Sequence, residues 1–201
     1  KTDLADNNLG GGNFSPRNDA FTQYVVGLPG PQLMAADYLR NASGQIIYDA
    51  SGLPEKTALK PMGSTVPKIY GGLNNSFNYK KFNLSFLVDY RFGNKILSST
   101  AYYSIYRGEN QLTLPGRETG VVGPGVTESG AANTTNVPAQ TYYQALAQRI
   151  SSLDVLDGSF IKLRQVTFGY TRGGTMLQHT PFSAINVSLV GRKLWTIMKR
   201  S

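Results

Sequence analysis

The chain has 201 residues, a formal net charge of +8, no cysteine and only 16% charged side chains. The absence of cysteine excludes disulfides and thiolate metal sites. The lysines and arginines form no run longer than two residues, so the positive charge does not indicate a nucleic-acid partner. No stretch approaches the roughly 18 apolar residues of a transmembrane helix. The 22 glycines, 12 tyrosines and 9 phenylalanines are typical of an all-β protein with many turns.

Residues 1–66 are expected to form a loop followed by a short hairpin. The first 20 residues are polar and rich in glycine, so they offer little to bury. Two turns of the same form, Asn41-Ala-Ser-Gly44 and Asp49-Ala-Ser-Gly52, bracket a short extended segment. Asn and Asp side chains bond their own backbone at such turns. Residues 53–67 contain three prolines and are expected to be a connector, because proline cannot donate to a sheet ladder.

Residues 67–93 hold two long runs in which apolar and polar residues alternate. A period of two is the pattern of a β-strand with two unlike faces, so a hairpin is predicted. The second run is longer than the usual strand of about 5–6 residues and matches the roughly 9–11 residues of a membrane-spanning strand. It places six apolar residues on one face: Phe82, Leu84, Phe86, Val88, Tyr90 and Phe92. The opposite face carries Asn83, Ser85 and the charge pair Asp89 and Arg91.

The corner between the two runs is Lys80-Lys81. A corner this short is typical of the periplasmic turns of outer-membrane barrels. Neither residue is Gly or Asn, which a tight hairpin turn prefers. A loop one or two residues longer is therefore expected.

Residues 94–153 lose the alternation and are expected to be a long extracellular loop. One short helix is predicted near 141–150, where Tyr142, Leu146 and Ile150 recur at helical spacing and Thr141 or Thr135 can cap the start. Tyrosine rings stack on sugar faces and also suit protein interfaces. Packing of the loop on itself explains the same tyrosines equally well. The candidates for contact with a ligand or a lid are Tyr102, Tyr103, Tyr106, Tyr142 and Tyr143.

Residues 154–201 are expected to form further strands. Within the first of them the apolar parity changes between Leu163 and Val166, which indicates either a bulge near Arg164 or a first half that stands above the membrane. In a continuous lipid-facing strand, Lys162 and Arg164 would each cost roughly 2–4 kcal/mol at the bilayer midplane, so they are expected at or above the headgroups. A second phase change is expected at Leu194-Trp195.

Candidate catalytic and metal-binding residues are few. His179 is the only histidine and is expected in a solvated loop. Asp37 and Asp49 lack the spacing of an EF-hand, and nothing beside the carboxylates of Asp154 and Asp157 would raise the pKa of either one. The sequence has no nucleophile elbow and no phosphate-binding loop. The chain is therefore not expected to be an enzyme or to hold a metal or cofactor.

Three stretches carry a resemblance to a known family: Pro67-Lys-Ile-Tyr-Gly-Gly-Leu-Asn-Asn-Ser-Phe-Asn-Tyr-Lys80, Phe82-Asn-Leu-Ser-Phe86 and Asp157-Gly-Ser-Phe-Ile-Lys-Leu-Arg-Gln-Val-Thr-Phe-Gly-Tyr-Thr171. Together they resemble the carboxy-terminal part of the SusC/RagA family of TonB-linked outer-membrane proteins, in the order in which the family has them. The family more often has Leu-Pro where this chain has Arg172-Gly173. That departure concerns only the geometry of one turn.

The resemblance implies an antiparallel, long-stranded sheet that is part of a transmembrane β-barrel of about 22 strands, with long extracellular loops. It implies a TonB-dependent importer of oligosaccharides or peptides in the bacterial outer membrane. The implied partners are a SusD-like surface lipoprotein, TonB, the glycan or peptide cargo and outer-membrane lipid. The family's signal sequence, TonB-contacting segment and plug are expected before Lys1, and a closing strand after Ser201.

Two interpretations of the hairpin remain open. In the barrel, the six apolar residues of 82–92 face lipid and the other face lines a wet lumen. In a secreted, soluble β-sandwich that binds carbohydrate, the same six residues are buried against a second sheet. A hydrolase has the weakest support, because it needs a carboxylate pair in a cleft.

Overall fold

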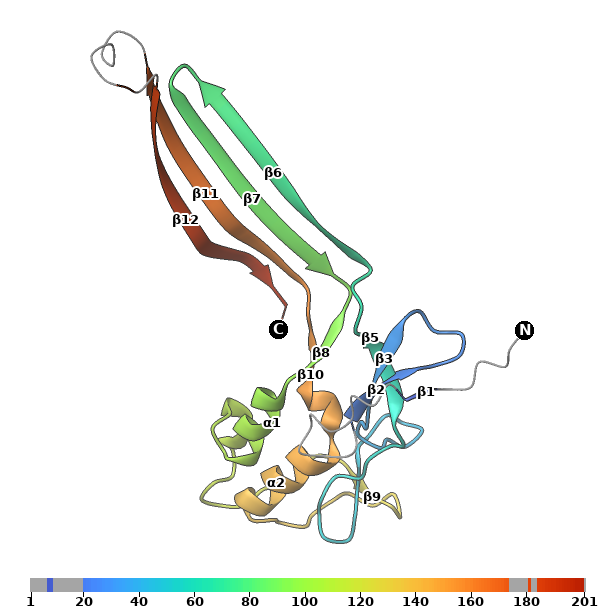
Figure 1. Cartoon of the computed structure of the whole chain (residues 1–201). Helices are drawn as coiled ribbons and strands as arrows, with labels where there is room; N and C mark the ends of the chain where they lie inside the picture. The colour runs from blue at the N-terminus through green and yellow to red at the C-terminus, as the bar shows by residue number, and fades with distance from the viewer. Residues whose placement is uncertain (1–6, 9–19, 174–180, 182–183, 201) are drawn as a thin grey trace. The chain divides into compact units, whose positions relative to one another are not determined.

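The computed structural model describes residues 7–8, 20–173, 181 and 184–200 (Figure 1). The chain divides into two compact units, each built from two separate segments. The mixed unit comprises residues Lys1–Val66 and Lys95–Asp157, and the sheet unit comprises Pro67–Asn94 and Gly158–Ser201. The predicted loop position of His179 lies outside the described residues.

The sheet unit is one antiparallel sheet of four strands, in the order β12-β11-β7-β6 (Figure 1). The strands are β6 (Ile69–Tyr79), β7 (Phe82–Phe92), β11 (Phe160–Gly173) and β12 (Ala184–Lys199). The predicted hairpin is therefore β6–β7, and both of its strands have 11 residues. The predicted fold class, an all-β chain with long antiparallel strands, is confirmed.

The register gives this sheet one apolar face. Residues directly opposite each other on paired strands point to the same side, and Phe82, Leu84 and Phe86 of β7 lie opposite Tyr170, Phe168 and Val166 of β11. The Phe82 and Phe168 rings stack at 5.7 Å between centroids. The face continues onto β12, where Phe168 lies opposite Leu189.

The other face is polar, and short side chains on neighbouring strands hydrogen-bond along it. The Asn83 amide donates to Ser76 Oγ at 3.0 Å and to Asn78 Oδ1 at 2.7 Å. On the same face, between β11 and β12, the Asn186 amide donates to Thr171 Oγ1 at 2.7 Å. Such ladders satisfy the polar groups of this face within the sheet.

A bulge at Arg164 explains the change of parity in β11. Leu163 lies opposite Val88 and Gln165 lies opposite Leu87, so Arg164 is one extra residue with no partner in the register. The register of β11 with β12 shifts at the same place. Of the two alternatives for this strand, the bulge is the one present.

The bulge also corrects the expectation for Lys162. This residue lies opposite Asp89, on the polar face, and Arg164 donates to the Asp89 carboxylate. The headgroup position was inferred from a continuous strand that would point both cations toward lipid. With the parity switched, neither cation lies on the apolar face, and no special depth is required for them.

The phase change expected in the last strand lies directly opposite this bulge. Arg192 pairs with Gln165 and Trp195 pairs with Leu163, so three positions of β12 span two of β11. The chain bends within this longer stretch at Lys193, which has a left-handed conformation with φ of 54°. Trp195 is thereby brought to the apolar face, level with Leu163.

The corner of the hairpin is tighter than expected. Tyr79 and Phe82 are paired, so the loop consists of Lys80 and Lys81 alone. Lys80 has φ of 53°, the left-handed region that costs a non-glycine residue about 1–2 kcal/mol. The expectation of a longer loop was wrong because the pairing of two long strands outweighs the strain at one residue.

The mixed unit contains a second antiparallel sheet, in the order β1-β2-β3-β5. Its strands are β1 (Asn7–Asn8), β2 (Ala20–Tyr24), β3 (Pro31–Ala35) and β5 (Lys60–Ser64). β1 and β5 lie where only a loop and a connector were predicted. β5 is the edge strand of the sheet, the position at which a strand tolerates a proline such as Pro61.

Two pairs of short strands close the mixed unit, and the first of them joins its two segments. β4 (Ile47–Tyr48) pairs in parallel with β9 (Val126–Thr127), and β8 (Lys95–Leu97) pairs antiparallel with β10 (Val155–Asp157). Each pair connects positions that are far apart in the sequence. The unit therefore depends on contacts between its two segments.

The two predicted turns around β4 are confirmed by their hydrogen bonds. Asn41 Oδ1 accepts from the backbone N–H groups of Ser43 and Gln45, at 3.0 and 2.9 Å. Asp49 Oδ1 accepts from those of Ser51 and Leu53, at 2.9 and 3.0 Å. The glycines that end the turns, Gly44 and Gly52, have φ of 81° and 74°.

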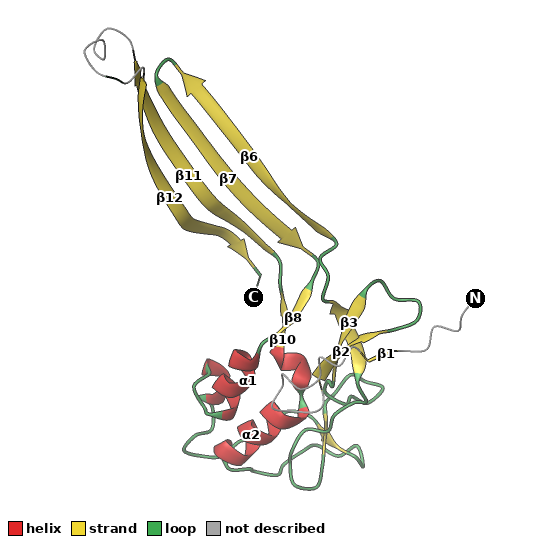
Figure 2. Ribbon diagram, viewed as in Figure 1, coloured by secondary structure: helices red, strands yellow, loops and turns green. Residues whose placement is uncertain are grey.

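Two α-helices lie in the segment predicted as one long loop, and Figure 2 shows both in red. α2 (Ala139–Arg149) takes the place of the predicted helix, but its N-cap is Pro138, with no side-chain cap from a threonine. α1 (Ser99–Tyr106) was missed, although Ser98 caps it by accepting from the N–H of Ala101 at 3.1 Å.

Two 3₁₀ turns complete the mixed unit, η2 (Gln111–Thr113) and η3 (Ser151–Asp154). Among the described residues, no helix is long and apolar enough to cross a membrane.

Candidate functional site

The apolar face of the sheet unit is uncovered. None of the six predicted lipid-facing residues of β7, namely Phe82, Leu84, Phe86, Val88, Tyr90 and Phe92, is buried. On β12, Leu189 and Trp195 are 77% and 66% exposed. Within the described residues no second sheet lies against this face, as the soluble sandwich would require. A continuous apolar surface of this kind marks a membrane or protein contact.

The polar face carries a cluster of cations beside one carboxylate. Lys162, Arg91 and Arg164 lie 4.4, 5.6 and 5.9 Å from the centre of the Phe160 ring. Asp89 accepts from Arg164 of the neighbouring strand. The face is therefore charged as well as polar, which suits contact with water and not with lipid.

The five candidate tyrosines of the mixed unit separate into two groups. Tyr102, Tyr142 and Tyr143 are buried, with 6% of Tyr142 exposed. Tyr103 is 40% exposed and Tyr106 is half-buried. Packing of the segment on itself, the alternative left open by the sequence, accounts for the buried three. Only Tyr103 and Tyr106 present a substantial part of the ring at the surface.

The buried tyrosines help to form the core of the mixed unit. Tyr142 packs with Tyr48, Leu146 and Ile150, and the hydroxyls of Tyr48 and Tyr142 lie 3.3 Å apart. Burial raises the pKa of both hydroxyls, since an ionised phenolate is poorly solvated there. Burial likewise raises the pKa of Tyr38, beside this core, to about 12. These groups stay neutral and serve packing, not proton transfer.

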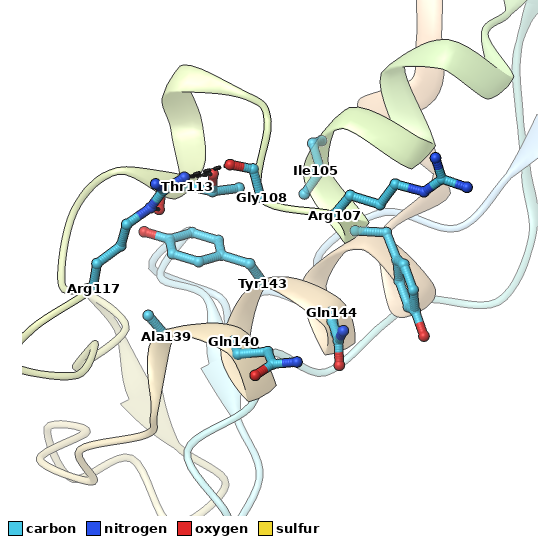
Figure 3. A pocket seen from close by; sticks show the side chains of 10 residues that line it. Ile105, Arg107, Gly108, Thr113, Arg117, Ala139, Gln140, Tyr143 and Gln144 are labelled. Carbon is cyan, nitrogen blue, oxygen red and sulfur yellow. Dashed lines mark hydrogen bonds between the residues drawn. The ribbon is translucent and has the colours of Figure 1, made fainter.

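A cleft of about 520 Å³ lies in the mixed unit, between the end of α1 and the start of α2 (Figure 3). Its lining comes from residues 105–108, Thr113, Arg117 and the first turns of α2. Tyr143 belongs to its wall, and its hydroxyl donates to the carbonyl of Pro115 at 2.9 Å. A second hollow of about 430 Å³ shares Arg117 with the cleft.

Arg117 fixes one end of the cleft. Its Nε donates to the carbonyl of Thr113 at 3.0 Å, and its Nη2 donates to Thr113 Oγ1 at 3.1 Å and to the carbonyl of Gly108. Figure 3 shows the guanidinium beside Thr113 and Gly108, with the Tyr143 ring below it. These bonds make the wall rigid, since they tie together the two loops that follow α1.

Three of the four carboxylates considered for catalysis or metal binding form ion pairs, and the fourth, Asp154, is buried in η3. Asp49 Oδ2 accepts from Arg149 at 2.7 Å, Asp37 lies 2.9 Å from Lys60, and Asp157 lies 3.8 Å from Lys95. Among the described residues no group of three or more His, Asp or Glu side chains is arranged to hold a metal.

The chain matches no protein-family model. It is similar in sequence to the TonB-dependent receptor P3 of Formosa agariphila, with 26% identity over 156 residues. The match covers 76% of this chain and 14% of the receptor. The chain therefore spans only a small part of that relative.

Two solved structures share its fold. One is the RagAB peptide importer in the closed-closed state, with a TM-score of 0.58 and 18% identity, and the other is the RagAB peptide transporter, with 0.55 and 16%. Each match covers 89% of this chain and 20% of the other. These relatives are a receptor and importers, not enzymes, and proteins of this kind lie in the outer membrane.

Proposed function

Because the chain is similar in sequence to a TonB-dependent receptor and shares the fold of RagAB, as its resemblance to the SusC/RagA family implied, we propose that it is part of a TonB-dependent importer of the bacterial outer membrane. The cargo proposed is an oligosaccharide or a peptide. The proposed partners are a SusD-like surface lipoprotein and, through parts of the receptor outside this chain, TonB.

The two-faced sheet is the observation that carries the proposal. β6 and β7 have 11 residues each, enough to cross the apolar band at the tilt of roughly 45° usual for barrel strands. Their apolar face is bare, and their polar face forms its own hydrogen bonds and ion pair. Lipid on one side and water on the other satisfy both faces at once.

The short Lys80-Lys81 corner supports an orientation. In barrels of this kind the short turns face the periplasm and the long loops face outside. The chain leaves β7 at the end opposite this corner and enters the segment 95–157 that holds α1 and α2. We therefore place the mixed unit on the cell surface, where cargo and the surface lipoprotein are met.

Two neighbouring apolar residues of β7 provide the test of this proposal. Val88 lies on the apolar face, opposite Leu163, whereas Leu87 lies on the polar face, opposite Gln165. In the full-length protein, Val88→Arg should prevent folding, because arginine facing lipid costs roughly 2–4 kcal/mol near the midplane. Leu87→Arg should fold, since its side chain enters the lumen. Heat-modifiable migration on a gel reports folding of each variant in outer membranes.

Hydropathy of the replaced residue cannot explain a difference between these variants, because both are aliphatic. If both fold equally well, or if Leu87→Arg is the one that fails, the apolar face does not meet lipid. Energised import is then measured separately, as uptake of labelled oligosaccharide or peptide by cells with and without TonB. Uptake that is independent of TonB would refute the importer.

A further inference from the structure

The cleft of the mixed unit has an aromatic wall that is held in place from behind. Tyr106 lines the cleft, and its ring stacks on that of the buried Tyr102, with centroids 5.6 Å apart and planes 24° apart. Tyr143 is held by its hydrogen bond to Pro115 and by an edge contact with Tyr142 at 5.3 Å. A ring fixed in this way offers flat apolar surface without a further loss of side-chain entropy on binding, and Tyr106 is the one of the two that presents a substantial surface.

Two amides also line the cleft. Gln140 and Gln144 are four residues apart on α2, so they project from the same side of the helix. Neither side chain forms a hydrogen bond with the described part of the protein. In Figure 3 both lie below the loop that holds Gly108. Each amide can both donate and accept, the capacity that hydroxyl groups of a ligand require.

The charge of the lining has one sign. Arg107 and Arg117 line the cleft, and no aspartate or glutamate does. Arg107 rests on the Tyr103 ring at 5.0 Å and has no carboxylate partner among the described residues. A planar guanidinium binds a carboxylate through two parallel hydrogen bonds. The cleft thus combines an aromatic wall, two neighbouring amides and a guanidinium that has no carboxylate partner among the described residues.

We propose that this cleft binds an oligosaccharide that carries a carboxylate, with a sugar ring against Tyr106, its hydroxyls on Gln140 and Gln144, and its carboxylate on Arg107. The volume of about 520 Å³ suits a ligand of a few sugar rings. The inference rests on the proposed function in taking this ligand to be cargo. A peptide of acidic residues has the charge but neither the C–H face of a sugar ring, which packs on a tyrosine, nor the hydroxyls.

The test is calorimetric titration of the full-length protein in detergent with trigalacturonate, maltotriose and triglutamate. Trigalacturonate should bind, maltotriose should bind at least about tenfold more weakly for want of the charge-assisted hydrogen bonds, and triglutamate should not displace trigalacturonate. If maltotriose binds as tightly as trigalacturonate, the carboxylate does not contribute to binding and the proposed role of Arg107 is wrong. Displacement by triglutamate would show that the site takes acidic peptides, and it would overturn the assignment to a sugar.

Matched variants locate the binding. Arg107→Gln and Gln144→Leu should each weaken trigalacturonate binding by about tenfold, the effect of losing roughly 1.4 kcal/mol. Their controls are Arg40→Gln, since Arg40 also rests on a tyrosine at 5.7 Å, and Gln111→Leu on the exposed turn η2. Neither control residue lines the cleft, so both should bind like the unaltered protein.

Binding that is insensitive to Arg107→Gln would overturn the proposal. Heat-modifiable migration of the same preparations separates the two proposals. A protein that folds in the membrane but does not bind trigalacturonate refutes the cleft assignment alone. A protein that binds trigalacturonate but is not heat-modifiable refutes the membrane assignment alone.

Discussion

Arg164 donates two hydrogen bonds to one oxygen of Asp89, from Nε at 2.8 Å and from Nη2 at 2.6 Å. The donor is the extra residue of a bulge, and the acceptor lies opposite Lys162 on the neighbouring strand. The bulge and the ion pair therefore lie at the same level of the sheet. Before Arg164 the apolar residues of β11 have odd numbers, and after it they have even numbers.

Removal of the bulge should be tolerated, because Arg164 is the residue without a partner in the register. Its deletion leaves Leu163 opposite Val88 and Gln165 opposite Leu87, so regular alternation keeps Lys162 on the polar face. The loss of the partly exposed ion pair with Asp89 should cost about 1 kcal/mol or less. Leu163→Arg instead places a cation on the apolar face at the same level, at roughly 2–4 kcal/mol near the midplane. Heat-modifiable folding of the full-length protein should be retained by the deletion and abolished by Leu163→Arg, and the reverse result would mean that the parity of this strand is not fixed by lipid.

Lys80→Gly should stabilise the hairpin. The residue has φ of 53°, which glycine adopts without strain, so a gain of about 0.5–1 kcal/mol is expected. The measurement is the temperature at which the full-length protein loses its heat-modifiable form, which should rise. Lys81→Gly is the control: Lys81 has no positive φ, so glycine there should lower the same temperature.

The two Ala-Ser-Gly turns allow strain and crowding to be separated. Gly44→Ala meets no atom within 4 Å, so it should cost only the strain of a left-handed residue, about 1–2 kcal/mol. Gly52→Ala would place its Cβ 2.8 Å from Thr135 Cβ and 2.9 Å from Val137 Cγ2, so its cost should be clearly larger. Amide hydrogen exchange of the mixed unit measures both losses. Similar losses would mean that the segment 131–138 moves aside easily.

Asp49 should make the mixed unit less stable in acid. Burial raises the pKa of this carboxyl, but hydrogen bonds from the Leu53 backbone and from Arg149 outweigh burial and hold the pKa below its usual range. The stability that Asp49 contributes is fully present at a pH above the pKa of an unfolded aspartate, near 4. It is lost as the pH falls through the lower pKa of Asp49 in the folded protein.

Asp49→Asn should therefore flatten this acid dependence. The turn itself should survive, because Asn41 supports the same turn with the same bonds. At neutral pH the loss should be about 0.2–1 kcal/mol, since both partners are partly exposed. Hydrogen exchange between pH 7 and pH 3 provides the measurement. An unchanged acid dependence in this variant would assign it to another group, such as Asp37.

The features that the sequence predicted well are those with a local cause. The turns at Asn41 and Asp49 follow from side chains that bond backbone groups two and four residues ahead. The bulge at Arg164 follows from a parity change visible within one strand. In both cases the information lies within a few residues, so no knowledge of distant partners is needed.

The features that the sequence did not predict depend on distant partners. Tyr142 looked equally suited to binding and to packing, and its contact with Tyr48, 94 residues away, decides for packing. α1 is rich in Ser, Thr and Tyr, which are poor helix formers, and it is stabilised by packing on α2. Ser98 was the one local signal for that helix. The cleft has no sequence pattern because its lining comes from three separate segments.

The hairpin also has a consequence for the order in which the chain folds. The mixed unit must join Asp49 to Arg149, which are 100 residues apart, and closing so long a loop is entropically costly. β6 and β7 pair between neighbours in sequence, and the N–H of Lys68 then bonds the carbonyl of Phe92 at 2.9 Å. Once that pairing forms, the chain on either side is joined by a short bridge instead of a long loop. Formation of the hairpin therefore shortens the loop that each later contact between the two segments has to close, and so lowers the entropic cost of those contacts.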